Sequence, residues 1–423
     1  MPDVAHSEDD GSHSLGHIAG IQRPLQEVLE KAAKKQFFRN SHEKEKRNVI
    51  EKEGPRAPAL RIPRDEAKGE SERDRDHRIT GERRQGVPDG RIDIQGDIFA
   101  ALRGLIERPK GGLRQWLATA LARSWRFWPE SWHQSRARAR RNILFHYDHD
   151  PEFYRQFLDE RMVYSCAYFE RPDMSLGDAQ LAKLDYICRK LDLQPGERFL
   201  DVGCGFGALV IRAAERYGAR AAGCTLSRRQ FEIARRAISE QGLQNAASIE
   251  DADYRDLDGR FDKIASVGMV EHVGVHRLPK YFAKIHAMLA PEGLFLNHGI
   301  TRPENVRPGA EWLFLRRKVF PGGELPYLRE VIRAAGRAGF EVLDVENLRP
   351  HYARTCRMWV ERLLTHKEAC LRLVGGEVHR TWVLYLAASA LNFEASLTEV
   401  HQTLLAKRSS PHARRWTRAH FYR

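Results

Sequence analysis

The chain has 423 residues, more than one average domain requires, and its formal net charge of +13 at pH 7 favours an anionic partner, either nucleic acid or a membrane surface. No apolar run approaches the roughly 20 residues that span a bilayer, and the first residues, MPDVAHSEDD, lack the basic start and apolar core of a secretory signal, so we expect a soluble or peripheral cytoplasmic protein. The 6 cysteines include no CxxC pair and no histidines cluster beside them, which argues against a disulfide framework and a metal site.

Residues 1–89 form a charged extension. They contain no Trp or Tyr, their only aromatic residues are Phe37 and Phe38, and acidic and basic residues alternate in stretches such as ESERDRDHRITGERR. Such a segment buries too little apolar surface to offset the entropy of ordering it. We expect it to be largely disordered, with a short amphipathic helix from Leu25 to Phe38. The alternative is a specific binding arm.

Residues 90–141 change in character, because tryptophans and arginines alternate between Leu102 and Arg141. The tryptophans are Trp116, Trp125, Trp128 and Trp132. This pairing suits a lipid headgroup interface, where indole lies at the apolar boundary and guanidinium meets phosphate. A helical pair that packs on the next domain explains the pattern equally well. Base stacking on RNA ranks third, since no RNA-binding motif accompanies it.

From about Pro195 short apolar runs alternate with amphipathic stretches, which predicts an α/β domain with a mainly parallel sheet. Gly218 is expected to close the first helix, and Ser227 to cap the second. Strands are expected within 198–205, 219–226, 246–251, 261–268, 292–300 and 340–348. Helices are expected over 208–218, 227–240, 277–290 and 327–338, followed by two long helical stretches.

A glycine motif, LDVGCGFG, occupies Leu200 to Gly207 between the first strand and the first helix. Its glycines let backbone amides approach a ligand, a geometry that dinucleotide sites share. Asp201, directly before the first glycine, would repel a pyrophosphate and suits the ammonium group of a sulfonium amino acid. The second strand is followed by GCTLSRRQ, without the acid that grips a ribose in dinucleotide sites.

Three further residues complete the expected cofactor site. Thr225 and Gln230 offer hydroxyl and amide contacts, and Tyr254 offers a flat face for an adenine. Helix capping alone is the alternative role for Thr225 and Ser227, and a surface turn is the alternative for Tyr254.

Five motifs occur in order: MVYSCAYF, AQLAKLDYICRKLDLQPG, LDVGCGFG, DYRDLDGRFDKIASVGMVEHVG and FPGGELP. With these motifs the chain, from about Arg91 to Leu405, resembles the cyclopropane-fatty-acyl-phospholipid synthases and the mycolic acid methyltransferases. RIDIQGDIFAA, residues 91–101, is similar to the end of that family's small N-terminal domain. The resemblance implies a class I, Rossmann-like methyltransferase domain over 142–405 with a helical, lipid-side subdomain, a remnant of the N-terminal domain over 90–141, and a basic tail over 406–423.

The resemblance also implies a reaction. In that family S-adenosylmethionine (SAM) gives a methyl(ene) group to the cis double bond of an unsaturated phospholipid acyl chain, and a cyclopropane ring forms as a bicarbonate ion accepts a proton. Because water would trap the cationic intermediate, a buried, aromatic-lined tunnel is expected. The implied holders of bicarbonate are Cys166, Glu271, His298, the backbone of Ile300, and Tyr352. Taken singly, these residues are also explained as a buried thiol, a helix-start carboxylate and a structural histidine.

Cofactor contacts carried over from the family form a longer set. They are Tyr164, Ser165, Phe199, Leu200, Asp201, Val202, Gly203, Cys204, Gly205, Phe206, Gly207, Thr225, Leu226, Gln230, Tyr254 and Arg255. The expected partner is the anionic inner face of the membrane rather than nucleic acid, and a homodimer stays open. The rival functions are methyl-branching of an acyl chain, methylation of a small amine, and a non-catalytic paralogue that binds membrane or nucleic acid.

The chain departs from the family pattern at three places. Phe206 replaces the usual Trp of the glycine motif, and LHTIG becomes NHGIT around His298, which introduces Gly299. In YLAASALNFEA, Ser389 replaces a cysteine and Glu394 an arginine. These changes bear on substrate identity more than on cofactor use.

Overall fold

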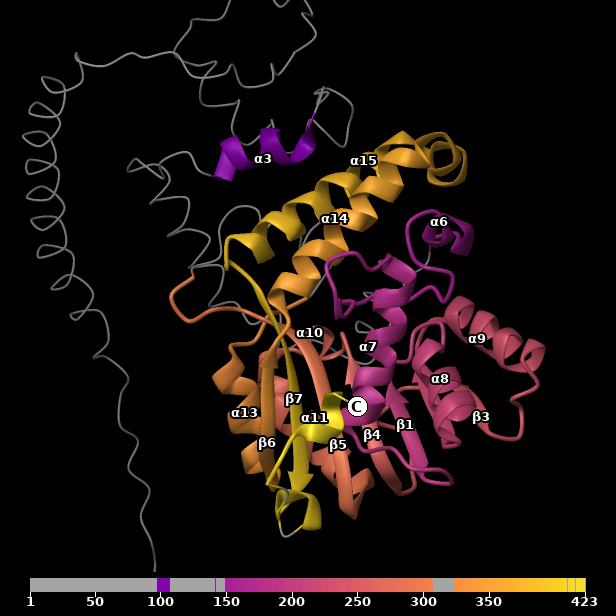
Figure 1. Cartoon of the computed structure of the whole chain (residues 1–423), viewed down its shortest axis with the longest axis vertical. Helices are drawn as coiled ribbons and strands as arrows, with labels where there is room; N and C mark the ends of the chain where they lie inside the picture. Colours follow the sequence, from indigo (N-terminus) through magenta and orange to yellow (C-terminus); the bar gives the residue numbers. More distant parts are fainter. Residues whose placement is uncertain are drawn as a thin grey trace, which may run out of the picture. The chain divides into compact units, whose positions relative to one another are not determined.

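The computed structural model describes residues 97–106, 141, 149–306, 323–408, 410–414 and 416–422. In this part of the chain a seven-stranded sheet has the order β3-β2-β1-β4-β5-β7-β6 and carries helices on both faces (Figure 1). The strands from β3 to β5 pair in parallel, and β7 is antiparallel to both of its neighbours. The expected α/β architecture, a mainly parallel sheet flanked by helices, is confirmed.

The first six strands lie where the sequence predicts them, and a seventh follows. They are β1 Arg198–Val202, β2 Arg220–Thr225, β3 Ala247–Asp251, β4 Phe261–Val267, β5 Leu289–Thr301, β6 Phe340–Asn347 and β7 Glu399–Lys407. The longer helices are α3 Ile98–Ile106, α7 Leu176–Lys190, α8 Ala208–Tyr217, α9 Arg228–Glu240, α11 Leu278–Met288, α13 Leu328–Arg337, α14 Arg349–Thr365 and α15 Lys367–Glu394. The short ones are α6 Pro151–Arg155, α10 Val270–Val273, η3 Val275–Arg277, η4 Pro411–Arg414 and η5 Ala419–Tyr422.

Two expected helix ends are confirmed at the atomic level. Gly218 follows α8 with a φ of 64°, a left-handed conformation that glycine adopts at little cost. The Ser227 hydroxyl accepts a hydrogen bond from the Gln230 amide at 3.4 Å and so caps α9. Gly218 turns the chain from α8 into the start of β2, and Ser227 begins α9 directly after the end of β2.

Strand β7 was not predicted. It inserts between β5 and β6, and its polar residues His401, Gln402 and Thr403 are buried together with the apolar ones. A strand buried on both faces shows no alternation of polar and apolar residues, so its sequence did not indicate a strand. The expected domain boundary at residue 405 falls inside β7, and beyond it Phe421 packs into the core formed with α7 and α8.

A helical subdomain accompanies the sheet. Helices α14 and α15 lie side by side (Figure 1), and α15 is two helical segments joined at Gly375, whose φ is 75°. Their buried face joins α6 and the segment after it in one apolar cluster. Glu394, at the family position of an arginine, accepts hydrogen bonds from Arg357 and also pairs with Arg103 of α3. This departure therefore ties α3, α14 and α15 together.

Several expectations lie outside the described residues. They are the disordered extension over 1–89, the helix from Leu25 to Phe38, and most of the Trp- and Arg-rich segment after Leu102. In the part of the chain that the structure describes, no helix combines the length and the apolar character needed to cross a membrane.

Candidate active site

The glycine loop joins β1 to α8, and its glycines take conformations that other residues avoid. Gly203, Gly205 and Gly207 have φ values of 80°, 55° and 86°. A Cβ on Gly207 would lie 2.9 Å from the Ala234 Cβ, so this glycine allows α9 to pack against the loop. A Cβ on Gly205 would meet nothing within 4 Å, because it would point into open space. Gly205 therefore leaves room for a ligand.

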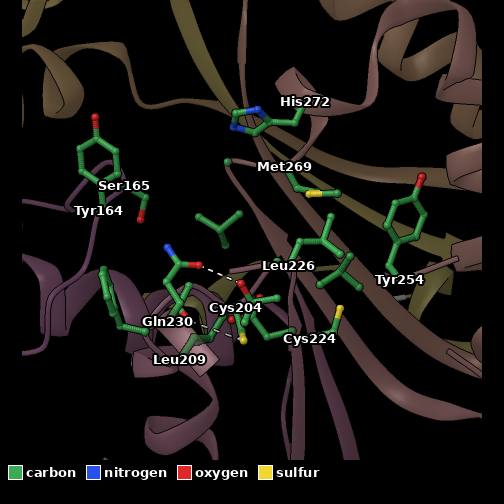
Figure 2. A pocket seen from close by; sticks show the side chains of 18 of the residues that line it. Tyr164, Ser165, Cys204, Leu209, Cys224, Leu226, Gln230, Tyr254, Met269 and His272 are labelled. Carbon is green, nitrogen blue, oxygen red and sulfur yellow. Dashed lines mark hydrogen bonds between the residues drawn. The ribbon is translucent and has the colours of Figure 1, made fainter. Parts of the chain in front are cut away.

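That space is a cavity at the carboxyl ends of β1, β2 and β4, where open α/β sheets bind ligands. Figure 2 shows Tyr164 and Ser165 on one side of it and Tyr254 on the opposite side. The expected cofactor residues that line it are Tyr164, Ser165, Asp201, Val202, Gly203, Cys204, Gly205, Phe206, Thr225, Leu226, Gln230, Tyr254 and Arg255. Phe199 and Leu200 do not line it, because their side chains are buried in the core layers on either face of the sheet, and Gly207 serves packing.

Two buried charged groups face this cavity. Asp201 is 3% exposed, and its Oδ1 has no hydrogen-bond partner among the described residues. Burial raises the pKa of Asp201 to about 7, against the opposing effect of the Lys183 ammonium. Lys183 is 2% exposed and donates to the Ser165 hydroxyl at 2.9 Å, and burial lowers its pKa to about 8. An unsatisfied buried carboxylate beside the glycine loop fits a cationic ligand.

The residues expected to meet ribose and adenine also line the cavity. The Thr225 hydroxyl donates to Gln230 Oε1 at 2.8 Å, a hydrogen bond drawn as a dashed line at Gln230 in Figure 2. The same hydroxyl accepts a hydrogen bond from the Ser227 amide at 3.2 Å. The Tyr254 ring is half-buried and packs edge-on to Tyr281 at 5.5 Å, so it does not lie in a mere surface turn. Arg255 is held by the Asp253 carboxylate, with Nε 2.8 Å from Oδ1. The loop after β3 is therefore preorganised.

Glu271 lies in α10, just beyond the end of β4. Its Oε1 accepts a hydrogen bond from the Ile300 amide at 2.6 Å, and its Oε2 is buried without a hydrogen-bond partner among the described residues. Ile300 lies past His298, the last residue of β5 that pairs with β4, so the carboxylate replaces a missing strand partner. Burial raises the pKa of Glu271 to about 7, although the hydrogen bond from Ile300 opposes the shift. The Ile300 N–H was expected to hold bicarbonate. It donates its hydrogen bond to Glu271 instead.

Gly299 explains why α10 approaches β5 so closely. A Cβ at this position would lie 2.2 Å from Val270 Cγ1 and 3.7 Å from Glu271 Oε2. The departure NHGIT therefore makes room for α10 and for the Glu271 carboxylate. The change in the neighbouring backbone is a packing feature of this chain.

We expect Gly299→Ala to destabilise the fold by about 1–3 kcal/mol, because the added methyl group overpacks the contact with Val270. Gly336→Ala is the matched control: it lies in α13, has no φ in the left-handed region, and its added Cβ would meet nothing within 4 Å. That change should be neutral or stabilising by about 0.5–1 kcal/mol. Chemical denaturation of both variants measures the difference, and equal unfolding midpoints would show that the contact at Gly299 is not tight.

His298 lies on β5 with both ring nitrogens buried. Its Nδ1 lies 3.2 Å from the Gln402 amide nitrogen, and its Nε2 has no hydrogen-bond partner among the described residues. Burial lowers the pKa of His298 to about 3, with the Lys183 and Lys190 charges adding to the effect. The imidazole is therefore neutral at physiological pH.

Cys166 and Tyr352 meet at the beginning of α14. The Cys166 thiol donates to the Ala167 carbonyl at 3.2 Å and lies 3.8 Å from the Leu348 carbonyl, which also accepts the Tyr352 amide. Burial raises the pKa of both side chains well above their usual ranges, and nearby acidic groups, Cys356 and Tyr385 ahead of Cys166 and Glu271, raise the pKa of Tyr352 further. The structure thus brings thiol, phenol and carboxyl groups within electrostatic range of one another, and the first two stay protonated.

Aromatic side chains connect the cavity with the helical subdomain. The Tyr164 ring lies 5.1 Å from Trp359 and 5.8 Å from Trp382, and its hydroxyl is 3.2 Å from that of Tyr385. Phe206, which stands where the family has Trp, lines the cavity and packs against Tyr154. Ser389 donates to its own helix at the Tyr385 carbonyl. The replacement of cysteine by Ser389 therefore has a local explanation only.

Comparison with known proteins identifies this arrangement. Residues 134–403 match the family model for mycolic acid cyclopropane synthetase. The chain belongs to this family. It is a SAM-dependent methyltransferase, as the family, its relatives and its structural neighbours are.

Within the family, the relatives match most of the described chain. A probable fatty acid methyltransferase of Pseudomonas putida is 41% identical over 347 residues, which cover 79% of this chain and 85% of the relative. The cyclopropane mycolic acid synthase MmaA2 of Mycobacterium tuberculosis is 37% identical over 277 residues, 63% of this chain and 96% of the relative. The crystal structure of mycolic acid cyclopropane synthase CmaA1 with SAH and CTAB superposes with a TM-score of 0.61 at 36% identity, over 63% of this chain and 98% of that one.

The site also contains residues that were not predicted. Lys183, Met269 and His272 line the cofactor cavity, and Gln402 contacts His298. Lys183 stands in the motif AQLAKLDYICRKLDLQPG, but its role depends on burial that the motif does not reveal. Among the described residues no group of three His, Cys, Asp or Glu side chains is arranged to hold a metal ion.

Proposed function

We propose that this methyltransferase adds a methylene group from SAM to the cis double bond of an unsaturated phospholipid acyl chain, forming a cyclopropane ring, with bicarbonate as the proton acceptor. The observation that carries the proposal is the pair of buried atoms Glu271 Oε2 and His298 Nε2, which have no hydrogen-bond partner among the described residues. Most buried polar atoms in folded proteins have a hydrogen-bond partner, and a small bound ion would supply one to both of these atoms. They accompany the protonated Cys166 and Tyr352, the other side chains that the family resemblance implies.

The cofactor cavity fits SAM. When bound, SAM supplies an electrophilic methyl group on a positively charged sulfur. The Asp201 carboxylate, with its unsatisfied Oδ1, would accept hydrogen bonds from an ammonium group, and Lys183 orients the Ser165 hydroxyl beside it. Gly205 leaves the backbone open to the ligand. Asp201 would thus meet the ammonium group of the amino acid, and the Ser165 hydroxyl would be available to its carboxylate.

The second group of residues fits a small oxyanion. Bicarbonate would take up the proton released as the ring closes. A neutral imidazole, a thiol and a phenol donate hydrogen bonds without neutralising an anion, so its basicity survives. Glu271, whose pKa burial raises to about 7, can ionise near neutral pH, and its Oε2 can then accept the hydrogen bond of the bicarbonate hydroxyl. The Lys183 charge acts on both Cys166 and His298 and favours an anion between them.

The aromatic residues support an apolar acceptor. Trp359 and Trp382 are buried in one apolar cluster, and the partly buried Tyr164 ring packs against both of them. An alkene is a weak nucleophile, so its alignment and the exclusion of water must supply much of the rate. An acyl chain against this cluster satisfies both needs, whereas a small amine would gain little from it.

Lipid analysis of a host without cyclopropane lipids tests the proposal. Expression of the chain should add one CH2 to unsaturated phospholipid acyl chains, and the product should resist ozonolysis because its double bond has been consumed. A methylated acyl chain that ozone still cleaves indicates branching rather than ring formation. Unchanged acyl masses together with a methylated amine would contradict a lipid acceptor.

We also propose peripheral association with the anionic inner face of the membrane. The net charge of +13 and the alternation of Trp and Arg after Leu102 support this proposal. Purified protein should bind vesicles that contain anionic phospholipid and release them as salt rises, since attraction to headgroups is screened beyond a Debye length of about 10 Å at 0.1 M. Co-sedimentation at several ionic strengths measures this. Equal binding to neutral vesicles under every condition would contradict it.

A further inference from the structure

Gln402 lies directly opposite His298 across two neighbouring strands. In the antiparallel pairing of β5 with β7, His298 is paired with Gln402, so their side chains project from the same face of the sheet. Gln402 is fully buried, and its Nε2 is 3.2 Å from His298 Nδ1. The two residues are 104 positions apart in the sequence, and only the insertion of β7 beside β5 brings them together.

The hydrogen bond at one ring nitrogen of a neutral histidine decides which nitrogen carries the proton. In this arrangement the Gln402 amide turns its Nε2, which can only donate, toward the ring, so Nδ1 accepts and the single ring proton lies on Nε2. His298 Nε2 is the buried atom without a partner among the described residues. The contact with Gln402 therefore turns this atom into a hydrogen-bond donor.

Among the described residues, no carboxylate hydrogen-bonds to His298 Nδ1. On the other side of β7, Glu346 is the residue paired with Gln402, but its Oε2 accepts Lys190 Nζ at 2.5 Å and the Tyr186 hydroxyl at 2.8 Å. Asp344 pairs with the same lysine at 3.3 Å. These acids are neutralised, which leaves the uncharged amide of Gln402 as the group that contacts the ring.

We propose that Gln402 is a positioning residue that holds His298 in the tautomer protonated on Nε2, so that this nitrogen donates a hydrogen bond to the anion bound beside Glu271. The donation to the anion rests on the proposed bicarbonate site, whereas the choice of tautomer does not depend on that site. A histidine with the proton on Nδ1 would turn a lone pair toward the anion and repel it. Gln402 thus acts on the reaction without contacting any reacting atom.

The test is 15N NMR of the histidine rings in the full chain, with the His298 signals identified by their loss in His298→Asn. In the wild type, Nε2 should show a bonded proton and Nδ1 the shift of a hydrogen-bonded acceptor. In Gln402→Glu, a carboxylate accepts rather than donates, so Nδ1 should gain the proton. In Gln402→Met, which removes the contact without adding a charge, Nδ1 should move to the shift of a free acceptor.

The Met variant also provides a kinetic readout. Removing outer partners of functional histidines at metal sites typically costs about 10–100-fold, and we expect a turnover loss of that order. SAM affinity should be unchanged because neither Gln402 nor His298 lines the cofactor cavity. A wild-type proton on Nδ1, or ring shifts that neither variant moves, would overturn the proposal.

The outcomes separate this inference from the proposed function. If the tautomer responds to Gln402 but turnover is indifferent to bicarbonate, the positioning role stands and the bicarbonate site fails. If turnover depends on bicarbonate while the His298 shifts ignore Gln402, the site stands and the positioning role fails. Should Gln402→Glu not fold, the wild-type and Met spectra still decide.

Discussion

Gly205→Val is expected to abolish SAM binding while leaving the fold intact. Gly205 has a φ of 55°, and a Cβ there would extend into the cofactor cavity without meeting protein within 4 Å. A branched side chain would fill the space of the ligand and would also strain the loop, since left-handed backbone costs a residue with a Cβ about 1–2 kcal/mol. Calorimetric titration with SAM measures the loss.

A matched control separates the two effects. Gly242 has a φ of 68°, an added Cβ there would again meet nothing within 4 Å, and the residue follows α9 outside the cavity. Gly242→Val therefore carries similar backbone strain without obstructing a ligand. It should keep full SAM affinity with a modest loss of stability. Equal SAM affinity in the wild type and Gly205→Val would show that the cofactor does not lie against the glycine loop.

The cofactor site could largely be predicted because its signals are local. The glycine turn, Asp201 and the Ser227 cap follow each other along a strand, a turn and a helix, and short-range stereochemistry determines them. Phe199 and Leu200 were assigned to the same site and yet point into the core on either side. Only residues at the carboxyl end of a parallel strand reach a ligand, whereas earlier ones serve packing. A motif taken as a block does not make this distinction.

Lys183 shows a different limit. In an amphipathic helix a lysine is normally placed on the solvent side, and α7 carries several charged residues. Lys183 is nevertheless buried, and the Asp159, Cys166 and Asp201 side chains are near enough to favour its charged form. That balance of charge involves segments that are far apart in the sequence. It becomes visible only when α7 is placed over the end of β1.

Gln402 was missed for a related reason. Its strand was not recognised, because β7 is buried on both faces and carries polar residues at adjacent positions. The contact between His298 and Gln402 depends on the register of the antiparallel pair β5 and β7, which no spacing along the sequence reveals. The family resemblance pointed to His298 but not to the residue that contacts its second nitrogen.

Glu271→Gln is expected to lower turnover by on the order of 100-fold or more, the usual effect of removing one preorganised group around a developing charge. SAM affinity should be preserved because Glu271 does not line the cofactor cavity. The glutamine can still accept the Ile300 amide, so α10 should keep its place on β5. What is lost is the ionisable carboxyl group at Oε2. Steady-state kinetics with a calorimetric SAM titration measure both quantities, and Glu341→Gln, at an exposed position on β6, is the control.

The stability of the same variant separates a loss of chemistry from a loss of folding. Burial raises the pKa of Glu271 from 4.5 to about 7, so the folded protein holds this proton more tightly than the unfolded chain does. The wild type therefore loses the stabilising contribution of the Glu271 proton as pH rises from 4.5 through about 7. The Glu271→Gln variant loses nothing at this position, because glutamine does not ionise. Glu271→Gln should match the wild type near pH 4 and unfold at a higher temperature than the wild type near pH 8. Turnover measured against bicarbonate concentration completes the comparison: full activity in bicarbonate-free buffer together with an unaffected Glu271→Gln would remove the proposed proton acceptor and leave a methyltransferase with another route for its proton.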